Sequence, residues 1–364
     1  MEARNSRKLF ALGQSIWYDN INRMLLQDGT LKKYIDEGVI YGVTTNPSIF
    51  AKAIPEDVYD KDISERVLKG HSTKEIYDAL TVEDVQTAAD LFRDLYEATA
   101  FVDGYVSLEV SPELAHDTEG TVRDVKRLSA FVNRPNVMFK IPGTKEGVPA
   151  IRKLVAEGFN INVTLLFDVI QYEAIARAYI DGISEFITKG GDARKVASVA
   201  SVFVSRIDSK VDKMVDQLGD EAAAIRGKAG VAIMKEVYSR FNELFSSEDW
   251  GVLKAHGARI QRVLWASTST KDPLYSATKY VDSLVAPDTV NTVPPNTLEE
   301  AAKGESPCMA LAYKPHFSEL EQFKVLGIDL RKACNELQTE GVEKFAVSFR
   351  EVLKVLDDKR KQLS

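Results

Sequence analysis

The stretch Ile161-Asn162-Val163-Thr164-Leu165-Leu166-Phe167 decides the fold that we expect for this chain. Its short length and apolar residues predict a buried β-strand, and the next segment, Val169–Ile187, has the apolar spacing of an α-helix. A strand followed directly by a helix is the unit from which parallel sheets and barrels are built. The fold class therefore depends on how often this unit recurs.

Further β-rich runs, each bounded by turn residues, lie on both sides of this stretch. They are Ser15–Ile21, Val39–Asn46, Tyr105–Ser111, Asn136–Pro142, Val196–Phe203, Arg262–Ser267 and Asn291–Val293. Helical patterns separate the runs, and Thr297 with Glu300 fits a capping box at the start of one helix. Eight strand–helix units predict an α/β protein with a closed (β/α)8 barrel, in preference to an open doubly wound sheet.

We expect a single barrel domain over residues 1–364, with helical extensions at both termini. The two long connections, 51–104 and 207–261, carry helical patterns, so they are expected to add helices and not linkers. Near the end of the chain, one apolar stripe predicts a helix that packs on the barrel. Its residues are Val342, Phe345, Phe349, Val352, Leu353 and Leu356.

The composition excludes several classes of protein. The 364 residues are 45% hydrophobic and 28% charged, enough for a large core without disulfides. The net charge is −7 and no basic cluster is dense enough to follow a phosphate backbone, so nucleic acid is not expected as a partner. The chain has only two cysteines, no apolar run as long as a membrane span and no secretory signal. These features predict a cytoplasmic protein with no membrane partner.

No cofactor or metal is expected either. The sequence has neither a Gly-x-Gly-x-x-Gly turn nor a Walker loop. Its four histidines lack ligand spacing, and they and the two cysteines are interpreted as structural or surface groups. These residues are His71, His116, His256, His316, Cys308 and Cys334.

Polar side chains occur within or at the end of otherwise apolar strands. Side chains of a barrel strand alternate between the interior and the helix layer, so the apolar neighbours of Glu109 place that carboxylate inward. The same alternation turns Asn162 and Thr164 inward together. Asn46 and Asp19 each end a strand-like run. All of them are expected at the carboxyl-terminal end of the barrel, where such enzymes carry their active sites.

Lys140 is the only charged residue of the run Val137-Met138-Phe139-Lys140-Ile141-Pro142. Burial lowers the pKa of an ammonium group and leaves an amine that can attack a carbonyl to form a Schiff base. The alternative for a lone lysine is a structural group that reaches water or pairs with Glu109. The surrounding carboxylates, amides and hydroxyl favour the nucleophile.

With these residues in view, the chain resembles the transaldolase family along the whole barrel. The likeness rests on Gly42-Val43-Thr44-Thr45-Asn46-Pro47-Ser48, Val106-Ser107-Leu108-Glu109-Val110, Phe139-Lys140-Ile141-Pro142, Asn160-Ile161-Asn162-Val163-Thr164-Leu165-Leu166-Phe167 and Ala200-Ser201-Val202-Phe203-Val204-Ser205-Arg206-Ile207-Asp208. The extra length of the two long connections suggests a longer subgroup.

The resemblance implies a transferase of the pentose phosphate pathway. It would move a dihydroxyacetone unit from sedoheptulose 7-phosphate to glyceraldehyde 3-phosphate, giving erythrose 4-phosphate and fructose 6-phosphate. Lys140 would form the Schiff base and Asp19 would act as general acid/base at the cleaved bond. Glu109 and Thr164 would activate a water, while Asn46 and Asn162 would hold hydroxyls of the retained unit.

For the phosphate group, the resemblance implies Arg206, with Ser201 lining the same pocket. A second arginine of the familiar family pattern is missing after the seventh strand, where the chain reads Trp265-Ala266-Ser267-Thr268-Ser269-Thr270-Lys271. We expect Lys271 to replace it, with Ser267 assisting.

Two other functions remain as alternatives. A fructose-6-phosphate aldolase-like lyase would use the same lysine but release dihydroxyacetone, and the length of this chain disfavours it. A barrel that binds sugar phosphates without catalysis would not need the buried amine and carboxylates. The sequence leaves open whether the chain is a monomer or a homodimer.

Overall fold

The computed structural model describes residues 4–304, 307–311 and 318–363, so His316 lies outside the described residues. Eight parallel strands close into one barrel, in the order of the sequence. They are β1 (Gln14–Tyr18), β2 (Gly42–Val43), β3 (Tyr105–Glu109), β4 (Val137–Pro142), β5 (Ile161–Leu166), β6 (Ser198–Phe203), β7 (Arg262–Ala266) and β8 (Thr289–Val293). The predicted (β/α)8 barrel is confirmed, and each strand overlaps the run expected for it.

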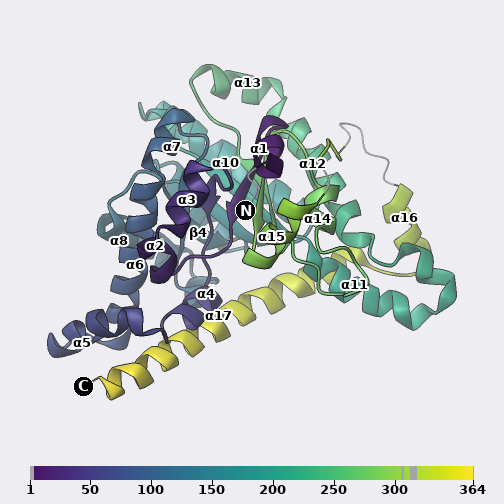
Figure 1. The fold of residues 1–364 in the computed structure, drawn as a ribbon. Helices are drawn as coiled ribbons and strands as arrows, with labels where there is room; N and C mark the ends of the chain where they lie inside the picture. The colour runs from purple at the N-terminus through teal and green to yellow at the C-terminus, as the bar shows by residue number, and fades with distance from the viewer. Residues whose placement is uncertain (1–3, 305–306, 312–317, 364) are drawn as a thin grey trace.

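Helices fill the connections and surround the barrel (Figure 1). They are α1 (Arg4–Ala11), α2 (Arg23–Gln27), α3 (Thr30–Asp36), α4 (Pro47–Ala53), α5 (Asp60–Leu68), α6 (Thr73–Leu91), α7 (Arg93–Ala98), α8 (Thr118–Val132), α9 (Gly147–Val155), α10 (Val169–Thr188), α11 (Ser205–Leu218), α12 (Ala229–Phe245), α13 (Glu248–Ala255), α14 (Lys279–Ser283), α15 (Pro295–Lys303), α16 (Ser318–Val325) and α17 (Leu330–Gln362). Short 3-10 turns are η1 (Asp57–Tyr59), η2 (Pro112–Leu114), η3 (Ala193–Lys195) and η4 (Asp220–Ile225). The long connections are helical, as expected, since they contain α5–α7 and η4–α13.

The amino-terminal end of the barrel is closed by a buried polar cluster. The Arg262 guanidinium donates to Asp103 (3.1 Å) and to the Ser15 hydroxyl (2.7 Å). Asp103 also accepts from the Trp17 indole at 3.0 Å. Because buried charges are stable only when they are paired, these contacts allow the Arg262 and Asp103 charges to lie inside this end of the barrel.

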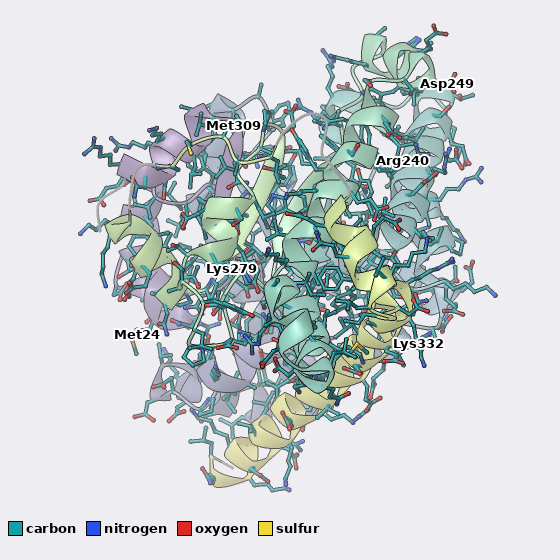
Figure 2. The ribbon with its side chains drawn as sticks, turned by 90° about the vertical axis from the view of Figure 1, so that its right-hand side faces the viewer. Met24, Arg240, Asp249, Lys279, Met309 and Lys332 are labelled. Atoms are coloured by element: carbon teal, nitrogen blue, oxygen red, sulfur yellow. The ribbon has the colours of Figure 1, made fainter. Side chains whose placement is uncertain are left out.

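α17 crosses the carboxyl-terminal end of the barrel. Gln338 donates to the backbone carbonyls of Gly143 (3.0 Å) and Leu165 (3.1 Å), where β4 and β5 end. The predicted apolar stripe is confirmed, since its side chains are buried or pack against the core. The helix is longer than the stripe, and it runs from beside α11 past α4 in Figure 1. Lys332 marks its first turn in the side view of Figure 2.

The end of β5 is irregular. The register with β6 shifts between Val163 and Leu166, and Leu165 has a φ of +61°. A non-glycine side chain is strained in that left-handed region, and such bulges often re-aim a strand beside an active site. The irregularity lies directly after Thr164, so it affects how β5 enters the carboxyl-terminal end.

The expected capping box at Thr297 and Glu300 is wrong. α15 begins at Pro295, after Pro294, and no side chain caps it. Proline at the first helical position has its φ already fixed and lacks the N–H group that would need a cap. Thr297 is therefore inside the first turn, where it is buried.

Candidate active site

A cavity of about 650 Å³ opens at the carboxyl-terminal end of the barrel. Most of the residues predicted for the site line it together. They are Asp19, Asn46, Lys140, Thr164, Ser201, Arg206, Ser267 and Lys271. The other two, Glu109 and Asn162, are buried behind this first layer.

The Lys140 side chain is 6% exposed and projects from β4. Its Nζ donates to the Thr45 carbonyl at 2.8 Å and lies 3.7 Å from Glu109 Oε2. The ring of Phe345, from α17, lies 5.4 Å from the same nitrogen. The amine is thus fixed between a carbonyl, a carboxylate and an aromatic face, with one side toward the cavity.

Glu109 ends β3 beside Lys140 and does not line the main cavity. Neither of its carboxylate oxygens has a hydrogen-bond partner among the described residues. Burial raises the pKa of Glu109 from 4.5 to about 7, against the lowering effect of the Lys140 cation. This carboxyl group can therefore gain or lose a proton near neutral pH.

The Thr164 hydroxyl is also buried without a hydrogen-bond partner in the described chain, and it faces the cavity from β5. Buried polar atoms in proteins are nearly always hydrogen-bonded to protein, water or ligand. β5 pairs with β4 next to Lys140, so Thr164 and Glu109 belong to strands on opposite sides of the lysine strand. Both groups are available to a small polar molecule.

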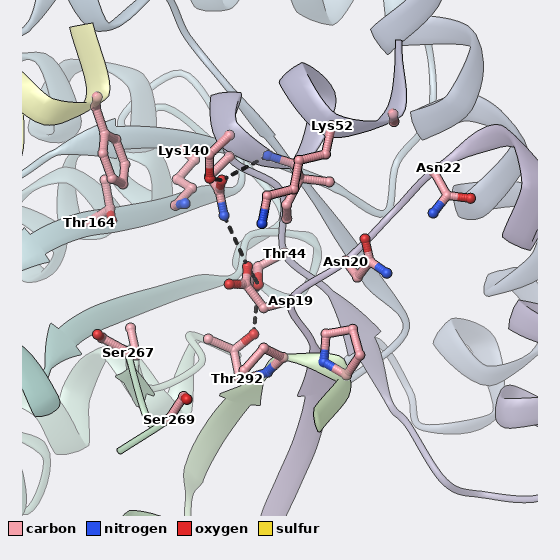
Figure 3. A pocket seen from close by; sticks show the side chains of 18 of the residues that line it. Asp19, Asn20, Asn22, Thr44, Lys52, Lys140, Thr164, Ser267, Ser269 and Thr292 are labelled. Atoms are coloured by element: carbon pink, nitrogen blue, oxygen red, sulfur yellow. Dashed lines mark hydrogen bonds between the residues drawn. The ribbon is translucent and has the colours of Figure 1, made fainter. Parts of the chain in front are cut away.

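Asp19 lies just after β1 and is oriented by threonines (Figure 3). Its Oδ1 accepts from the Thr44 hydroxyl at 2.7 Å, and Thr44 in turn contacts the Thr292 hydroxyl at 2.6 Å. The hydrogen bond holds one carboxylate oxygen in place. A carboxylate oriented in this way can accept a proton from a hydroxyl group in the cavity.

Asn46 has two tasks at the start of α4. Its Oδ1 caps the helix by accepting from the Ile49 N–H (3.2 Å) and the Ser48 hydroxyl (2.6 Å). Its Nδ2 lies 3.5 Å from Asp19 Oδ1, on the cavity side. The cap fixes the amide so that its NH₂ group is presented to a ligand beside Asp19.

Asn162 is fully buried and does not line the cavity. It donates to the Ser107 hydroxyl at 2.9 Å and accepts from the Ser201 hydroxyl at 2.7 Å. Ser201 does reach the cavity. The inward orientation predicted for Asn162 is thus found, but its hydrogen bonds to two serines place it one layer below the surface that a ligand meets.

Arg206 and Lys271 also line the cavity, and neither forms an ion pair with a residue that the structure describes. Arg206 follows β6 and has a buried Nη1 with no hydrogen-bond partner among the described residues. Its guanidinium lies 5.0 Å from the Phe203 ring and 5.9 Å from the Phe345 ring. Burial lowers the pKa of Arg206, and partial burial, followed by the nearby Arg206 charge, lowers the pKa of Lys271. An anion bound between them would relieve both effects.

Ser267 connects the two strand ends that carry these cations. Its hydroxyl contacts that of Ser205 at 2.8 Å, and its carbonyl accepts from the Ser205 N–H at 3.1 Å. Ser267 has a φ of +55°, a strained conformation that is common at functional sites. The serine therefore aligns the loop after β7 with the start of α11.

Several residues of the site were not predicted. Thr44 was part of a quoted motif but its bond to Asp19 depends on strand pairing, and Phe345 was predicted only as a core residue of its helix. Lys52, on α4, also lines the cavity, and its ammonium group points into it in Figure 3. An apolar stripe carries no signal that one of its rings faces an active site.

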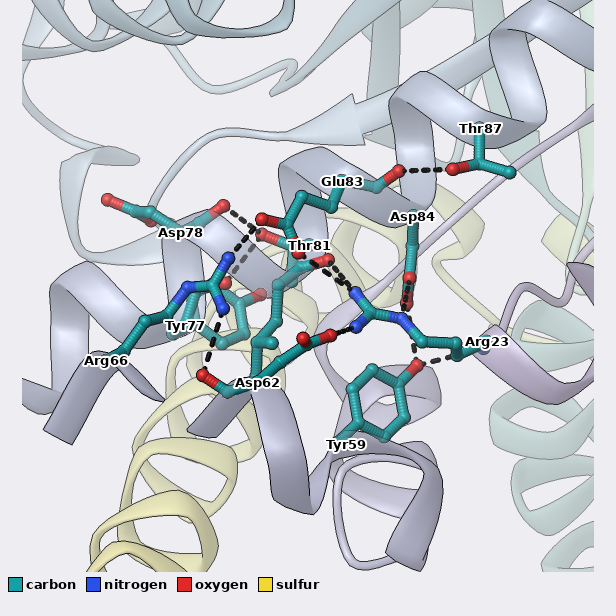
Figure 4. A network of polar contacts seen from close by, with 11 residues as sticks. Arg23, Tyr59, Asp62, Arg66, Tyr77, Asp78, Thr81, Glu83, Asp84 and Thr87 are labelled. Atoms are coloured by element: carbon teal, nitrogen blue, oxygen red, sulfur yellow. Dashed lines mark hydrogen bonds and ion pairs between the residues drawn. The ribbon is translucent and has the colours of Figure 1, made fainter. Parts of the chain in front are cut away.

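One wall of the cavity is stabilised by a buried arginine (Figure 4). Arg23, on α2, donates to Asp84 at 2.8 Å and also pairs with Asp62 and Glu83. The hydroxyl of Tyr59 donates to Asp84 at 2.6 Å, and its side chain lines the cavity. The network joins α2 to α5 and α6, so the long connection after β2 forms a fixed wall.

Within the ranges that the structure describes, no group of three or more His, Cys, Asp or Glu side chains is arranged to hold a metal ion. None of the described helices is both long and apolar enough to span a membrane. Cys308 is exposed and Cys334 is buried, and both are free.

Comparison with known proteins gives a consistent result. The family model for transaldolase/fructose-6-phosphate aldolase matches residues 16–356. A protein named Transaldolase 2 from Nostoc sp. is 42% identical over 97% of this chain and 96% of its own length. A protein named Transaldolase from Mycolicibacterium smegmatis is 44% identical over 96% of this chain and 95% of its own length. The chain therefore belongs to the transaldolase/fructose-6-phosphate aldolase family.

Proposed function

We propose that the protein is a transaldolase of the pentose phosphate pathway. It transfers a dihydroxyacetone unit from sedoheptulose 7-phosphate to glyceraldehyde 3-phosphate, with erythrose 4-phosphate and fructose 6-phosphate as products. The observation that carries this proposal is the position of the buried Lys140 amine. It lies beside Glu109 and in the same cavity as two cations, Arg206 and Lys271, that have no ion pair in the described part of the chain.

In the proposed reaction, the Lys140 amine attacks the ketone carbon of the donor, and loss of water gives an iminium ion. Asp19 then takes the proton from the hydroxyl on the carbon two positions from the iminium carbon, and the bond between that hydroxyl-bearing carbon and the carbon next to the iminium breaks. The electron pair of that bond passes into the iminium, which becomes an enamine, and the first aldose phosphate leaves. The enamine attacks the carbonyl of the second aldose, Asp19 returns the proton, and hydrolysis frees Lys140.

Glu109 and Thr164 are proposed to bind and activate the water that forms and breaks the Schiff base. A carboxyl group with a pKa of about 7 can both donate and accept protons at neutral pH, which both directions of this step require. The unpartnered Thr164 hydroxyl supplies a second hydrogen bond for that water.

The other site residues are proposed to bind substrate. The Nδ2 group of Asn46 suits a hydroxyl next to Asp19, and Ser201, fixed by Asn162, suits one beside Lys140. Arg206 and Lys271 would bind the phosphate, with Ser267 assisting. A planar guanidinium and an ammonium group are both common phosphate ligands.

The proposal is tested by trapping the intermediate. Incubation with fructose 6-phosphate and borohydride, followed by mass spectrometry of peptides, should place a three-carbon adduct on Lys140. Lys140→Met should give no adduct, whereas Lys153→Met, at an exposed lysine that pairs with Glu119, should leave the adduct unchanged.

Adding an acceptor aldose distinguishes transaldolase activity from fructose-6-phosphate aldolase activity. Sedoheptulose 7-phosphate should form only when erythrose 4-phosphate is added to the untrapped sample. Rapid release of free dihydroxyacetone without an acceptor would support the aldolase, and the absence of any adduct on Lys140 would refute the Schiff base.

We further propose that the chain works in the cytoplasm as a single domain, as a monomer or homodimer, without a cofactor, metal or nucleic-acid partner. The single hydrophobic core, the two free cysteines and the net charge of −7 support this description. Light scattering of the purified protein would give its oligomeric state.

A further inference from the structure

We propose that Arg226 is a positioning residue for phosphate recognition, which holds the loop after β7 so that Lys271 is free to bind a phosphate group. The inference rests on the proposed phosphate role of Lys271. Arg226 does not line the cavity, so its effect on a bound phosphate would be indirect. It would act through Asp272, the neighbour of Lys271 in the chain.

The loop that carries Lys271 contains neither helix nor strand between β7 and α14. A lysine on such a loop has many side-chain and backbone conformations, and binding a ligand in one of them costs conformational entropy. In addition, Asp272 directly follows Lys271 and could neutralise it. A phosphate site here therefore needs a fixed loop and a carboxylate that is occupied elsewhere.

Arg226 meets both needs with its three nitrogens. Nη2 donates to Asp272 Oδ2 at 2.7 Å, Nη1 to the Tyr275 hydroxyl at 2.7 Å, and Nε to Asp216 Oδ1 at 2.9 Å. Asp272 is held further because its Oδ1 accepts from the Leu274 N–H at 2.9 Å. Both oxygens of the carboxylate are thus used within the protein, and Lys271 has no ion pair with a described residue.

A second layer fixes the other end of the loop. The Tyr275 hydroxyl donates to Asp212 at 2.7 Å, and the Lys279 ammonium lies 3.8 Å from the Tyr275 ring. Asp212 also accepts from the Gly227 N–H at 2.7 Å. The ring lies so close to residue 227 that a Cβ there would come within 2.6 Å of it. The loop is therefore packed against the backbone next to Arg226.

Arg226 comes from the long connection 207–261, immediately after η4. The extra length of that connection therefore contributes a residue that orders the loop after β7. The connection supplies the group that pairs with Asp272, and the loop after β7 supplies a lysine in place of an arginine. Phosphate binding by Lys271 therefore depends on Arg226, because Lys271 is free to bind a phosphate only while Asp272 is paired with Arg226.

Steady-state kinetics of Arg226→Gln test the proposal. The KM for fructose 6-phosphate and the inhibition constant of inorganic phosphate should both rise about tenfold, while kcat changes by less than about twofold. Arg226→Lys, which keeps the charge but fewer donors, should lie between the parent and Arg226→Gln. It also provides a second variant if Arg226→Gln folds poorly.

A double variant distinguishes the proposed positioning role of Arg226 from a role in stability alone. Adding Asp272→Asn to Arg226→Gln removes the carboxylate that would capture Lys271, so phosphate affinity should partly recover. A loss of stability would not be reversed in this way. If the second substitution leaves the constants unchanged or worsens them, the proposed route through Asp272 is wrong.

Arg240→Gln is a matched control. Arg240 is exposed to the same degree as Arg226 (28% against 27%) and also bonds two carboxylates, those of Glu173 and Glu243. It lies on α12, apart from Lys279 in Figure 2, and does not line the cavity. Its replacement should leave both constants unchanged.

Lys271→Met separates this inference from the function on which it rests. If Lys271→Met leaves phosphate binding unchanged, the phosphate role of Lys271 fails. If Lys271→Met weakens binding but Arg226→Gln does not, only the positioning role fails. In the double variant, Arg226→Gln should add nothing to Lys271→Met, and additive effects would overturn the proposal.

Discussion

Replacing Glu109 with Gln should make the protein more stable at alkaline pH, because the buried carboxylate opposes folding when it is charged. Burial raises the pKa of Glu109 from 4.5 to about 7. The folded chain therefore holds this proton more tightly than the unfolded chain. The contribution to stability is intact below pH 4.5, falls as the pH rises through 7, and is constant above that.

The size of the effect follows from the shift. Each pKa unit corresponds to about 1.4 kcal/mol, so the shift amounts to roughly 3 kcal/mol in the free energy of unfolding. Between about pH 5 and pH 8, the parent chain should lose about 2.5 kcal/mol relative to Glu109→Gln. Gln keeps the shape and polarity of the side chain and has no charge to bury.

Urea unfolding of both proteins at the two pH values measures this difference. Trp17, Trp250 and Trp265 are buried, so their fluorescence reports unfolding. Glu173→Gln is the control, because the Arg240 hydrogen bond lowers the pKa of Glu173 to about 2 and its titration lies below the window. A stability difference between parent and Glu109→Gln that stays constant within about 1 kcal/mol across the window would refute the reasoning.

Three further outcomes are expected. The initial rate should fall below about pH 7, where Glu109 protonates, and a profile that is flat through this pH would contradict its role as a base. Arg206→Leu should raise the KM for fructose 6-phosphate by about tenfold or more with a smaller change in kcat, measured by steady-state kinetics; an unchanged KM would remove Arg206 from the phosphate site. Phe345→Ala should lower the free energy of unfolding by about 3 kcal/mol in urea, and a loss below about 1 kcal/mol would mean that the ring is not packed as described.

The barrel could be predicted from the sequence because each strand is short, apolar and bounded by turn residues. Alternation also placed Glu109 and Thr164 inward, since side-chain direction in a strand is a local property. Asp19 and Asn46 could be placed at this end of the barrel because each of them ends a strand-like run. The positions of these residues could be predicted from the local sequence alone.

The remaining features depend on contacts between distant segments. Asn162 points inward as expected, but its bonds to Ser107 and Ser201 keep it below the cavity surface. Phe345 enters the site only because α17 crosses the barrel. The expected start of α15 failed because Pro295 fixes the first turn without a cap. Tertiary packing decided the first two points, whereas the start of α15 was a local signal, Pro294-Pro295, that the expected capping box overlooked.

The distribution of side chains around the barrel divides the proposed site into two halves. The amine and the two carboxylates come from β1 to β4, whereas Arg206 and Lys271, the groups proposed to bind phosphate, follow β6 and β7. Changes in the second half of the gene can therefore alter which sugars are accepted while leaving the bond-breaking groups untouched. In a chain arranged in this way, changes in the loops after β6 and β7 could alter the acceptor specificity while Lys140, Asp19 and Glu109 stay the same.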